Sequence, residues 1–249
     1  MQTPVVIKIG GNDLENPGFV EGLARAVASM APPVVIVHGG GREISALQTQ
    51  LGLTPQYVDG MRVTDEASLA VAEMVLSGRV NKRLVAALLN AGVDAIGVSG
   101  VDRGLVRVEK MPHPAGDLGR VGRVTSVRGE VLLRLLAEGV TPVVSPISLG
   151  PDGPYNVNAD HVAGAIALAI GASAVTFLTN VPGVLVGEQV AATLTANQAE
   201  QLIASGVIYG GMVPKTHAAL DVIAGGVPRA VITDLGGLSN GMGTAFVAA

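Results

Sequence analysis

The chain has 249 residues, of which 49% are hydrophobic and 14% are charged, and its formal net charge is −4. This composition excludes an intrinsically disordered protein, and it argues against a nucleic-acid-binding surface, which needs clustered Lys and Arg. The sequence contains no cysteine, which excludes disulfides and thiolate metal sites. The length suits one large domain or two closely joined lobes.

Short runs rich in Val and Ile alternate with amphipathic stretches along the chain. The predicted strands are Val5–Ile9, 34–37, 93–98, 141–145 and 173–178. The predicted helices are 16–30, 42–51, 66–77, 79–91, 129–138 and 159–170. Because the strands are almost entirely apolar and helices separate them, we expect an α/β fold with a mainly parallel sheet covered on both faces.

Two features interrupt this alternation. Between residues 104 and 127, Val and Arg alternate with Gly, Pro and polar residues, which predicts a β-hairpin that covers a substrate as a flap. A lobe boundary is predicted near Gly171, where the second half of the sheet begins. It divides the chain into residues 1–171 and 172–249.

The sequence favours a cytoplasmic protein without membrane attachment. Residues 1–4 lack the basic stretch that opens a secretory signal sequence. Residues 161–179 contain no acidic or basic side chain apart from His161, but Gly171 and Ser173 interrupt this run. A buried helix followed by a buried strand explains the run better than a membrane-spanning helix.

Lys8 stands inside the first predicted strand, just before the pair Gly10 and Gly11. A buried lysine is costly unless its charge has a partner, and adjacent glycines let a phosphate approach the backbone. In parallel sheets ligands bind beyond the carboxyl ends of the strands, where these glycines lie. The alternative is a lysine whose stem is buried and whose ammonium group reaches solvent.

Two further glycine clusters precede helical stretches, one at residues 38–41 and one at residues 210–211 ahead of Lys215. Free N–H groups at a helix N-terminus, together with glycine backbone, form an anion site. Neither cluster is a Walker A loop or a dinucleotide-binding fingerprint, so tight structural turns are the alternative. His38 fits a structural hydrogen bond better than a catalytic role.

Polar residues gather in two other segments. Within residues 60–65, Arg62 could bind a carboxylate bidentately; alternatively this arginine is a solvated loop charge and a neighbouring side chain caps the next helix. Asn156, Asn158 and Asp160 stand at the start of a very apolar helix. Capping explains one of these three side chains, and all three together predict a polar pocket.

The order and spacing of these motifs resemble the amino-acid kinase superfamily, and within it the N-acetylglutamate kinases. The resemblance extends from Val5 to about Val227 and is most specific in segments 60–65 and 156–160. It implies a three-layer α/β/α sandwich with an open, mainly parallel sheet. The N-terminal lobe would bind the acyl amino acid and mediate dimerisation, and the C-terminal lobe would bind ATP. Residues 118–122 are similar to the family's substrate-covering hairpin.

The resemblance also implies a role for each motif residue. Lys8 and Lys215 would stabilise the transferring phosphoryl group, and Asp160 would orient both lysines. Gly40 and Gly41 would provide backbone N–H groups at the reacting end. Arg62 and Asn156 would contact the α-carboxylate and nearby groups of N-acetyl-L-glutamate. The residues that would line the nucleotide site are Gly10, Gly11, Asn180, Val181, Pro182, Gly183, Val184, Leu185, Val207, Ile208, Tyr209, Gly210 and Gly211.

The implied chemistry agrees with these residue types. A carboxylate is ionised at pH 7 and needs no general base to attack phosphorus, so the barrier is geometric and electrostatic. Two lysines, glycine N–H donors and Mg²⁺ would supply positive potential where charge spreads. We expect Mg²⁺ to arrive mainly with ATP, and therefore expect no metal site built by the protein alone.

Some positions depart from the family pattern. Asn180 stands where an aspartate is common, and Arg42 stands where proline is frequent. The chain begins almost directly with its first strand, and the segment after Asp234 is short, whereas arginine-inhibited members carry an additional N-terminal helix and a longer element there. We therefore expect insensitivity to arginine and a homodimer rather than a hexamer.

Two alternative functions are compatible with the sequence. A kinase for glutamate or aminoadipate attached to an acidic carrier protein would need a basic docking surface, and several arginines between residues 103 and 128 cluster near the predicted flap. A non-catalytic sensor of a nucleotide or amino acid could keep the same fold. The presence of Lys8, Lys215 and Asp160 favours an enzyme over a sensor.

Overall fold

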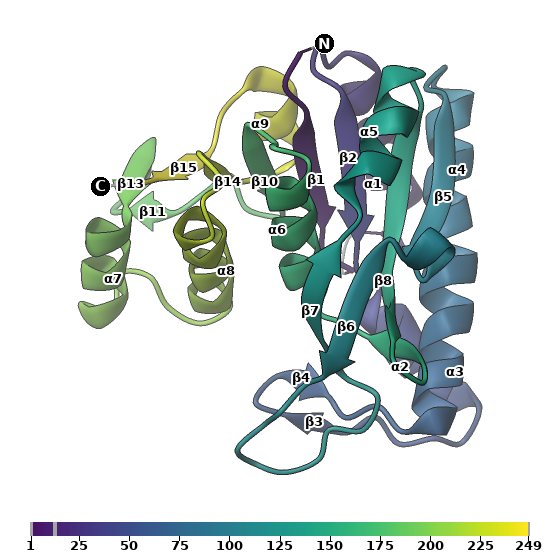
Figure 1. Cartoon of the computed structure of the whole chain (residues 1–249). Coiled ribbons are helices and arrows are strands. Elements are labelled where there is room, and N and C mark those ends of the chain that lie inside the picture. Colours follow the sequence, from purple (N-terminus) through teal and green to yellow (C-terminus); the bar gives the residue numbers. More distant parts are fainter. Residues whose placement is uncertain (1, 12–13, 249) are drawn as a thin grey trace.

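A sheet of eleven strands forms the centre of the molecule (Figure 1). The computed structural model describes residues 2–11 and 14–248 of the chain. The strands are β1 (Val5–Ile9), β2 (Val34–His38), β3 (Tyr57–Val58), β4 (Met61–Arg62), β5 (Ala95–Gly100), β6 (Val106–Lys110), β7 (Gly122–Val127), β8 (Thr141–Gly150), β9 (Gly153–Asn156), β10 (Ala174–Leu178), β11 (Leu185–Val186), β12 (Gln189–Val190), β13 (Thr193–Thr195), β14 (Ala230–Thr233) and β15 (Thr244–Val247). The helices are α1 (Pro17–Ala28), α2 (Gly41–Gln50), α3 (Glu66–Glu73), the π-helix η1 (Met74–Val80), α4 (Asn81–Asn90), the 3₁₀-helix η2 (Asp102–Gly104), α5 (Gly129–Ala137), α6 (Ala159–Ala169), α7 (Ala196–Ala204), α8 (Met212–Ala224) and α9 (Leu235–Asn240).

Strand β1 lies inside the sheet between β10 and β2, and both pairings are parallel. The order along the main path is β13-β15-β14-β10-β1-β2-β8-β6-β7, and β5 and β9 also pair with β8. Antiparallel pairing joins β6 to β7, β8 to β9 and β14 to β15. Because β1, β2 and β10 are parallel neighbours, their carboxyl ends lie at the same edge of the sheet.

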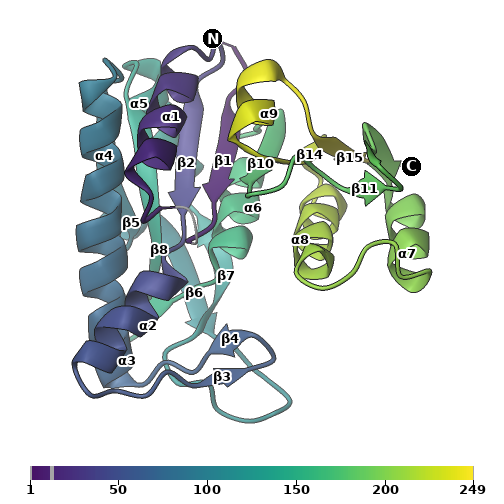
Figure 2. The same ribbon diagram turned by 180° about the vertical axis from the view of Figure 1, so that it is seen from behind.

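Alternate side chains of β1 enter two separate apolar cores. Val6 belongs to the core that includes buried residues of α5, α6 and α8. Ile7 and Ile9 belong to the core that includes buried residues of α1, α2, α3 and α4. Figures 1 and 2 show these two groups of helices on opposite faces of the sheet. The expected three-layer α/β/α sandwich with an open, mainly parallel sheet is therefore confirmed.

The helices expected at 66–77 and 79–91 form one continuous rod. Helix α3 passes directly into the π-helix η1, which passes directly into α4. The break expected near Gly78 is absent because a single glycine lowers helix propensity without ending a helix. The hydroxyl of Ser77 lies 2.8 Å from the hydroxyl of Ser145, and this hydrogen bond joins η1 to β8.

The flap is a hairpin as expected, and the strand beside it is longer than expected. Strands β6 and β7 pair in antiparallel register, which confirms the hairpin predicted within residues 104–127. The strand expected at 141–145 continues to Gly150 because its second half pairs with β6 and β9. Strand β8 therefore links the centre of the sheet to the base of the flap.

The apolar run at 161–179 is divided between two elements. Helix α6 ends at Ala169, and β10 begins at Ala174. The helix and the strand lie on either side of the turn at Gly171, as expected from the sequence. The helix buries only one face, however, because Leu168 is 56% exposed. Over the ranges 2–11 and 14–248, every helix is too short or too polar to span a membrane.

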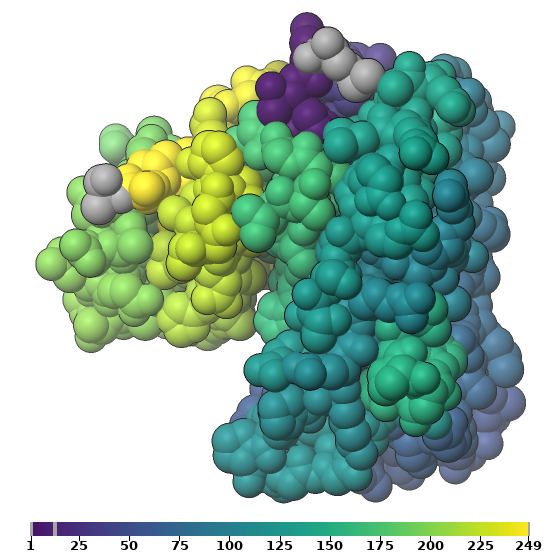
Figure 3. Space-filling model, viewed as in Figure 1, coloured from purple at the N-terminus to yellow at the C-terminus, as the bar shows by residue number. Residues whose placement is uncertain are grey.

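Helices α7 and α8, together with β11, β12, β13 and β15, extend to one side of the main body. Figure 3 shows a hollow between this part of the chain and the rest of the molecule. The sheet is nevertheless continuous across the predicted boundary at Gly171, because β10 pairs with β1. The division into an amino-acid-binding part at 1–171 and an ATP-binding part at 172–249 stays a prediction.

Strand β2 ends in His38, whose side chain is fully buried. Its Nδ1 atom lies 2.9 Å from the carbonyl oxygen of Gly39, and its Nε2 atom lies 3.2 Å from the side-chain nitrogen of Asn81. The ring proton on Nδ1 therefore donates to Gly39, and Nε2 accepts from Asn81. Burial lowers the pKa of His38 to about 4. His38 is a neutral, structural hydrogen-bonding residue, as the sequence favours.

Acidification from pH 7 to pH 5 is expected to destabilise the protein through His38. The unfolded chain takes up a proton near pH 6.5, whereas the folded chain stays neutral down to about pH 4, so stability present above pH 6.5 is lost as the pH falls toward 4. This one group should lower the free energy of unfolding by about 2 kcal/mol between pH 7 and pH 5. Urea unfolding at the two pH values measures the loss.

The control for this experiment is the exposed His217 on α8. The variant His38→Gln should show a clearly smaller difference between pH 7 and pH 5 than the wild type, whereas His217→Gln should behave as the wild type does. An unchanged difference in the His38→Gln variant would show that His38 is not the group responsible.

Candidate active site

Two glycine loops meet where β1 and β2 end. Strand β1 runs into Gly10 and Gly11, and β2 is followed by Gly39, Gly40 and then α2, which begins at Gly41. A Cβ atom on Gly11 would lie 2.9 Å from the Cα atom of Gly40, so the two backbones are in close contact. The first N–H groups of α2 have no partners within the helix. Backbone donors are therefore concentrated at this edge of the sheet.

A cavity of about 480 Å³ opens beside these loops. Lys8, Asp160 and Lys215 all line it, together with Gly10, Gly11 and Asn180. The Nζ atom of Lys8 lies 2.8 Å from Oδ1 of Asp160, and these side chains are only 16% and 25% exposed. The structure thus brings together the three residues that the sequence predicts for phosphoryl transfer.

The pleat of the sheet explains why Lys8 reaches Asp160. Val6 and Lys8 point to the same face of β1, which α6 covers, because side chains two residues apart share a face. Asn158 caps α6, and its Oδ1 atom accepts from the N–H of Asp160 at 2.8 Å. Asp160 is thereby fixed in the first turn of the helix, where the helix dipole stabilises a carboxylate.

A second cavity, of about 320 Å³, adjoins the first. The two are contiguous at Gly211 and Lys215, which line both. Pro182 and Gly210 lie in the same loops but outside the lining of both cavities. The residues predicted for a nucleotide site that do line the second cavity are Val181, Gly183, Val184, Leu185, Val207, Ile208, Tyr209 and Gly211.

A third cavity, of about 140 Å³, adjoins the first through different residues. Asn158 and His161 line both the first and the third cavity. Arg62 and Asn156 line the third cavity, and Val121 of the flap contributes to its wall. The three cavities therefore form a row, with the ion pair on β1 and α6 in the middle one.

The guanidinium group of Arg62 is held by neutral partners. Its Nη2 atom donates to the carbonyl oxygen of Gly41 and to Oγ of Ser45, both at 2.8 Å, and its Nη1 atom donates to the side chain of Gln48. The Cζ atom lies 4.8 Å from the centroid of the Tyr57 ring. Only 8% of Arg62 is exposed, and this burial lowers its pKa. Because these partners carry no negative charge, the fixed cation can still attract an anion.

Asn156 is connected to Arg62 through Thr64. The side-chain amide of Asn156 donates to Oγ1 of Thr64 at 3.2 Å, and this hydroxyl donates to the carbonyl oxygen of Arg62 at 2.9 Å. Gly40 and Gly41 lie outside the lining of the three cavities. Gly41 nevertheless takes part in the site, because its carbonyl oxygen positions Arg62.

Some residues in this site had no substrate-binding or catalytic role assigned from the sequence, and His161 and Thr64 are two examples. His161 follows Asp160 in α6 and lines two cavities, and Thr64 joins Arg62 to Asn156. The sequence places both beside recognised motifs, which is a signal that they lie near the site. It does not indicate which polar groups approach them, since their neighbours come from distant segments.

Comparisons with known proteins identify the family to which the chain is similar. The model of the Amino acid kinase family matches residues 3–234. An acetylglutamate kinase of Roseiflexus sp. (strain RS-1) is 60% identical over 243 residues, which cover 98% of this chain and 93% of that protein. An acetylglutamate kinase of Chloroflexus aurantiacus is 51% identical over 249 residues, which cover 99% of this chain and 97% of that protein.

A solved structure has the same fold over its whole length. The structure of a protein from Streptococcus mutans UA159 covers 100% of both chains, with a TM-score of 0.83 and 28% sequence identity. Together with the family match over most of the chain, this confirms the resemblance that the motifs indicate. The chain belongs to the amino acid kinase family.

Proposed function

We propose that the protein is an acetylglutamate kinase, which transfers the γ-phosphoryl group of ATP to the γ-carboxylate of N-acetyl-L-glutamate in the second step of arginine biosynthesis. The observation that carries this proposal is the row of three adjoining cavities, with Lys8, Asp160 and Lys215 in the middle one. The row offers adjacent places for an acyl amino acid, a transferring phosphoryl group and a nucleotide. The names of the relatives at 60% and 51% identity support the same activity.

In the proposed reaction a carboxylate oxygen of the acyl amino acid attacks the γ-phosphorus atom. The bond from this phosphorus to the β–γ bridging oxygen breaks, and ADP leaves with that electron pair. The attacking carboxylate is already ionised at pH 7, so no side chain has to remove a proton. Catalysis then depends on bringing two anions into line and on neutralising the charge between them.

The residues of the middle cavity are suited to this neutralisation. We assign Lys8 and Lys215 to the oxygens of the transferring phosphoryl group. Gly40 and Gly41 lie outside the lining of this cavity, beside Gly11, which lines it, and we assign their backbone N–H groups to the reacting end. Asp160 holds the ammonium group of Lys8 at 2.8 Å and would keep it directed into the cavity. A fixed cation needs no reorganisation when charge develops, which is why this arrangement would accelerate transfer.

The third cavity is the proposed site for the acyl amino acid. Arg62 would bind its α-carboxylate, since the guanidinium group is fixed and its partners are neutral. Asn156 would donate to or accept from the adjacent polar groups. Free glutamate would place an ammonium group near the same cation, which favours the acetylated amino acid as substrate.

The second cavity is the proposed nucleotide site. Its walls are largely apolar, and the exposed side chains of Leu185, Val207 and Tyr209 would lose contact with water against an adenine ring.

In the ranges 2–11 and 14–248, no group of three or more His, Asp or Glu side chains could hold a metal ion alone. Asn180 and Asp221 line the first cavity and would provide oxygen ligands for Mg²⁺ brought by ATP, which would neutralise phosphate charge there.

Turnover is expected to depend on the acetylated amino acid. ADP release in the presence of ATP and Mg²⁺ would be compared for N-acetyl-L-glutamate, glutamate, N-acetylaspartate and aminoadipate. Hydroxylamine converts the acyl phosphate into a hydroxamate that can be measured. We expect kcat/KM for N-acetyl-L-glutamate to exceed that for the other acids by about 100-fold or more, because a buried polar site rejects mismatched groups strongly. The proposal would be contradicted if none of these acids yielded a hydroxamate.

Such a failure would favour a carrier-bound substrate or a sensor. Of the five arginines in the cluster near the flap, Arg120, Arg123 and Arg128 each form an ion pair with at least one carboxylate, whereas the exposed Arg103 and Arg107 form none among the described residues. The three pairs reduce the attraction of this surface for an acidic carrier protein, and the two other arginines keep that alternative open to the test above.

Replacement of Arg62 is expected to weaken the binding of the acyl amino acid selectively. The variant Arg62→Gln should raise the KM for N-acetyl-L-glutamate about tenfold to hundredfold, as expected for the loss of a hydrogen bond to a charged group. The KM for ATP should change by less than about twofold, because Arg62 lies outside the second cavity. Steady-state kinetics with each substrate varied in turn measure both constants.

The exposed Arg25 on α1 provides the control, and Arg25→Gln should leave both constants unchanged. Circular dichroism would verify that both variants fold. An equal rise of the two KM values in Arg62→Gln would contradict the assignment of Arg62 to the acyl amino acid.

We also propose that the enzyme is a homodimer. The exposed apolar side chains of Met74, Leu89 and Ile96 belong to η1, α4 and β5. Figure 1 shows α4 and β5 together at one side of the molecule, and β5 pairs with β8 alone among the described strands. An apolar surface beside an open strand edge is typical of an interface. The expected insensitivity to arginine and the expected cytoplasmic location stay predictions.

A further inference from the structure

A short segment of the flap, residues 118–121, is inserted between the two chain segments that carry the proposed substrate contacts. Isolated parallel bridges join it to Thr64 on one side and to Asn156 on the other. The N–H of Arg120 donates to the carbonyl oxygen of Thr64 at 2.6 Å, and the N–H of Asn156 donates to the carbonyl oxygen of Arg120 at 2.9 Å. The backbone of Arg120 therefore bonds to both neighbours.

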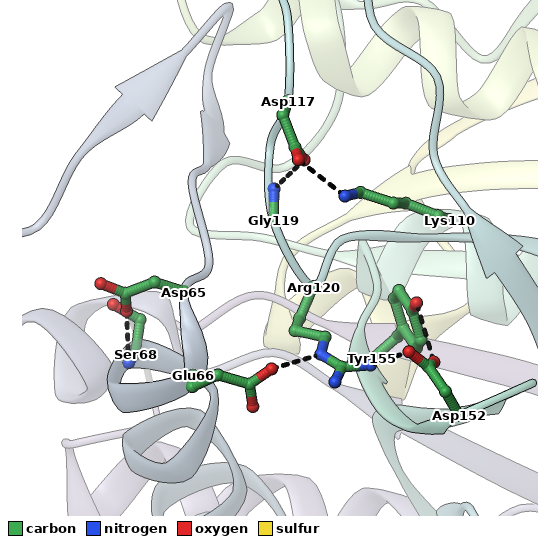
Figure 4. Close-up of polar contacts among 9 residues, drawn as sticks. All are labelled: Asp65, Glu66, Ser68, Lys110, Asp117, Gly119, Arg120, Asp152 and Tyr155. Atoms are coloured by element: carbon green, nitrogen blue, oxygen red, sulfur yellow. Dashed lines mark hydrogen bonds and ion pairs between the residues drawn. The ribbon is translucent and has the colours of Figure 1, made fainter.

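The side chain of Arg120 makes a second connection between the same segments (Figure 4). Its Nε atom lies 2.7 Å from Oε1 of Glu66 in the first turn of α3, and its Nη1 atom lies 2.8 Å from Oδ2 of Asp152 in the turn before β9. The Cζ atom lies 5.3 Å from the centroid of the Tyr155 ring, and the hydroxyl of Tyr155 donates to Asp152 at 3.0 Å. One cation thus joins a carboxylate from each flanking segment.

Arg120 and Asp152 remain charged at neutral pH. The hydrogen bond with Glu66 raises the pKa of Arg120, and the hydrogen bond from Tyr155 lowers the pKa of Asp152. The side chain of Arg120 is 24% exposed, whereas those of Glu66 and Asp152 are 74% and 58% exposed. The arginine is therefore the shielded centre of the cluster, and the two carboxylates form its outer part.

The flanking strands need such a connection because they belong to different sheets. Strand β4 has two residues and pairs with β3, and β9 has four residues and pairs with β8, so these ladders do not fix the position of β4 relative to β9. A shift of the strand pairing by two residues would leave each side chain on the same face of the sheet. The alternation of side chains between the two faces therefore does not specify the register here. At Gly119, where φ is +73°, a Cβ atom would lie 2.2 Å from the carbonyl oxygen of Thr64. This close contact requires glycine where the flap passes Thr64, and the side chain of Arg120 adds a contact to each flanking segment.

We propose that Arg120 is a positioning residue that assembles the amino-acid subsite before substrate binds. By pairing with Glu66 and Asp152 it would hold the segments of Arg62 and Asn156 at a fixed separation. The proposal rests on the proposed function for the identity of the substrate. It does not require Arg120 to touch the substrate.

Kinetics of Arg120 variants test the proposal. In Arg120→Gln the KM for N-acetyl-L-glutamate should rise about threefold to tenfold, the size expected when two exposed ion pairs and a cation–π contact are lost. The KM for ATP and kcat should stay within about twofold, because the chemistry occurs in the middle cavity. Arg120→Lys should recover part of the loss. A general loss of structure would instead lower the melting temperature and change all constants together, and that result would overturn the proposal.

A neighbouring arginine provides a matched control. Arg123 pairs with Glu109 across the two strands of the flap and does not join the flap to another segment. Arg123→Gln removes the same charge from the same hairpin, so it should leave the KM for N-acetyl-L-glutamate unchanged. Equal effects of Arg120→Gln and Arg123→Gln would overturn the proposal, because they would reflect the charge of the flap alone.

A double variant separates positioning from electrostatic repulsion. Loss of Arg120 leaves two unpaired carboxylates near the subsite, and these would repel an anionic substrate even without any displacement. The double variant Glu66→Gln, Asp152→Asn removes both carboxylates together with both ion pairs. Positioning predicts a raised KM for N-acetyl-L-glutamate in this variant, whereas repulsion predicts a KM at or below that of the wild type. The second result would overturn the proposal.

Hydrogen exchange tests the same contact without reference to catalysis. The amide protons of Arg120 and Asn156 that bond across the segments should exchange about threefold to tenfold faster in Arg120→Gln than in the wild type. Amides of β1 should be unaffected in both proteins. Faster exchange with no turnover of N-acetyl-L-glutamate by the wild type would disprove the proposed function and keep the positioning role. Unchanged exchange would disprove the positioning role itself.

Discussion

The ion pair between Lys8 and Asp160 is the contact on which the proposed site depends. A lysine among the buried residues of an interior strand is tolerated because a carboxylate meets its ammonium group at the end of the strand. The same contact joins β1 to α6, whose first turn also carries His161 between two of the cavities. The parallel order β10-β1-β2 places every loop that surrounds this pair at one edge of the sheet.

Two arginines near the proposed amino-acid subsite show how their partners determine what a cation can do. Arg62 is held by a carbonyl, a hydroxyl, an amide and an aromatic ring, so its charge can attract a substrate carboxylate. Arg120 lies between Glu66 and Asp152, so its charge is used to join two parts of the protein. The first arrangement suits recognition and the second suits support, although both side chains belong to the same residue type.

Most of the fold, and the meeting of Lys8, Asp160 and Lys215 at one cavity, could be predicted from the sequence. The apolar strands and their glycine ends indicate a parallel sheet, and Lys8, Asp160 and Lys215 stand in motifs that place them at its carboxyl edge. The π-helix η1 could not be predicted, because the period of apolar residues does not distinguish it from an ordinary helix. The ion pairs of Arg120 could not be predicted either, since the carboxylates that it contacts come from distant segments of the chain. Charged surface residues also show no periodic pattern along the sequence.

The most direct test of the account is the effect of Lys8→Met on catalysis compared with its effect on binding. We expect kcat to fall about 100-fold to 1,000-fold, as for the loss of one group that stabilises developing charge, while calorimetric dissociation constants for N-acetyl-L-glutamate and for a non-hydrolysable ATP analogue change by less than about threefold. This result would place Lys8 at the transferring phosphoryl group. A kcat within a few fold of the wild type, with both ligands still bound, would contradict the central role of the Lys8–Asp160 pair.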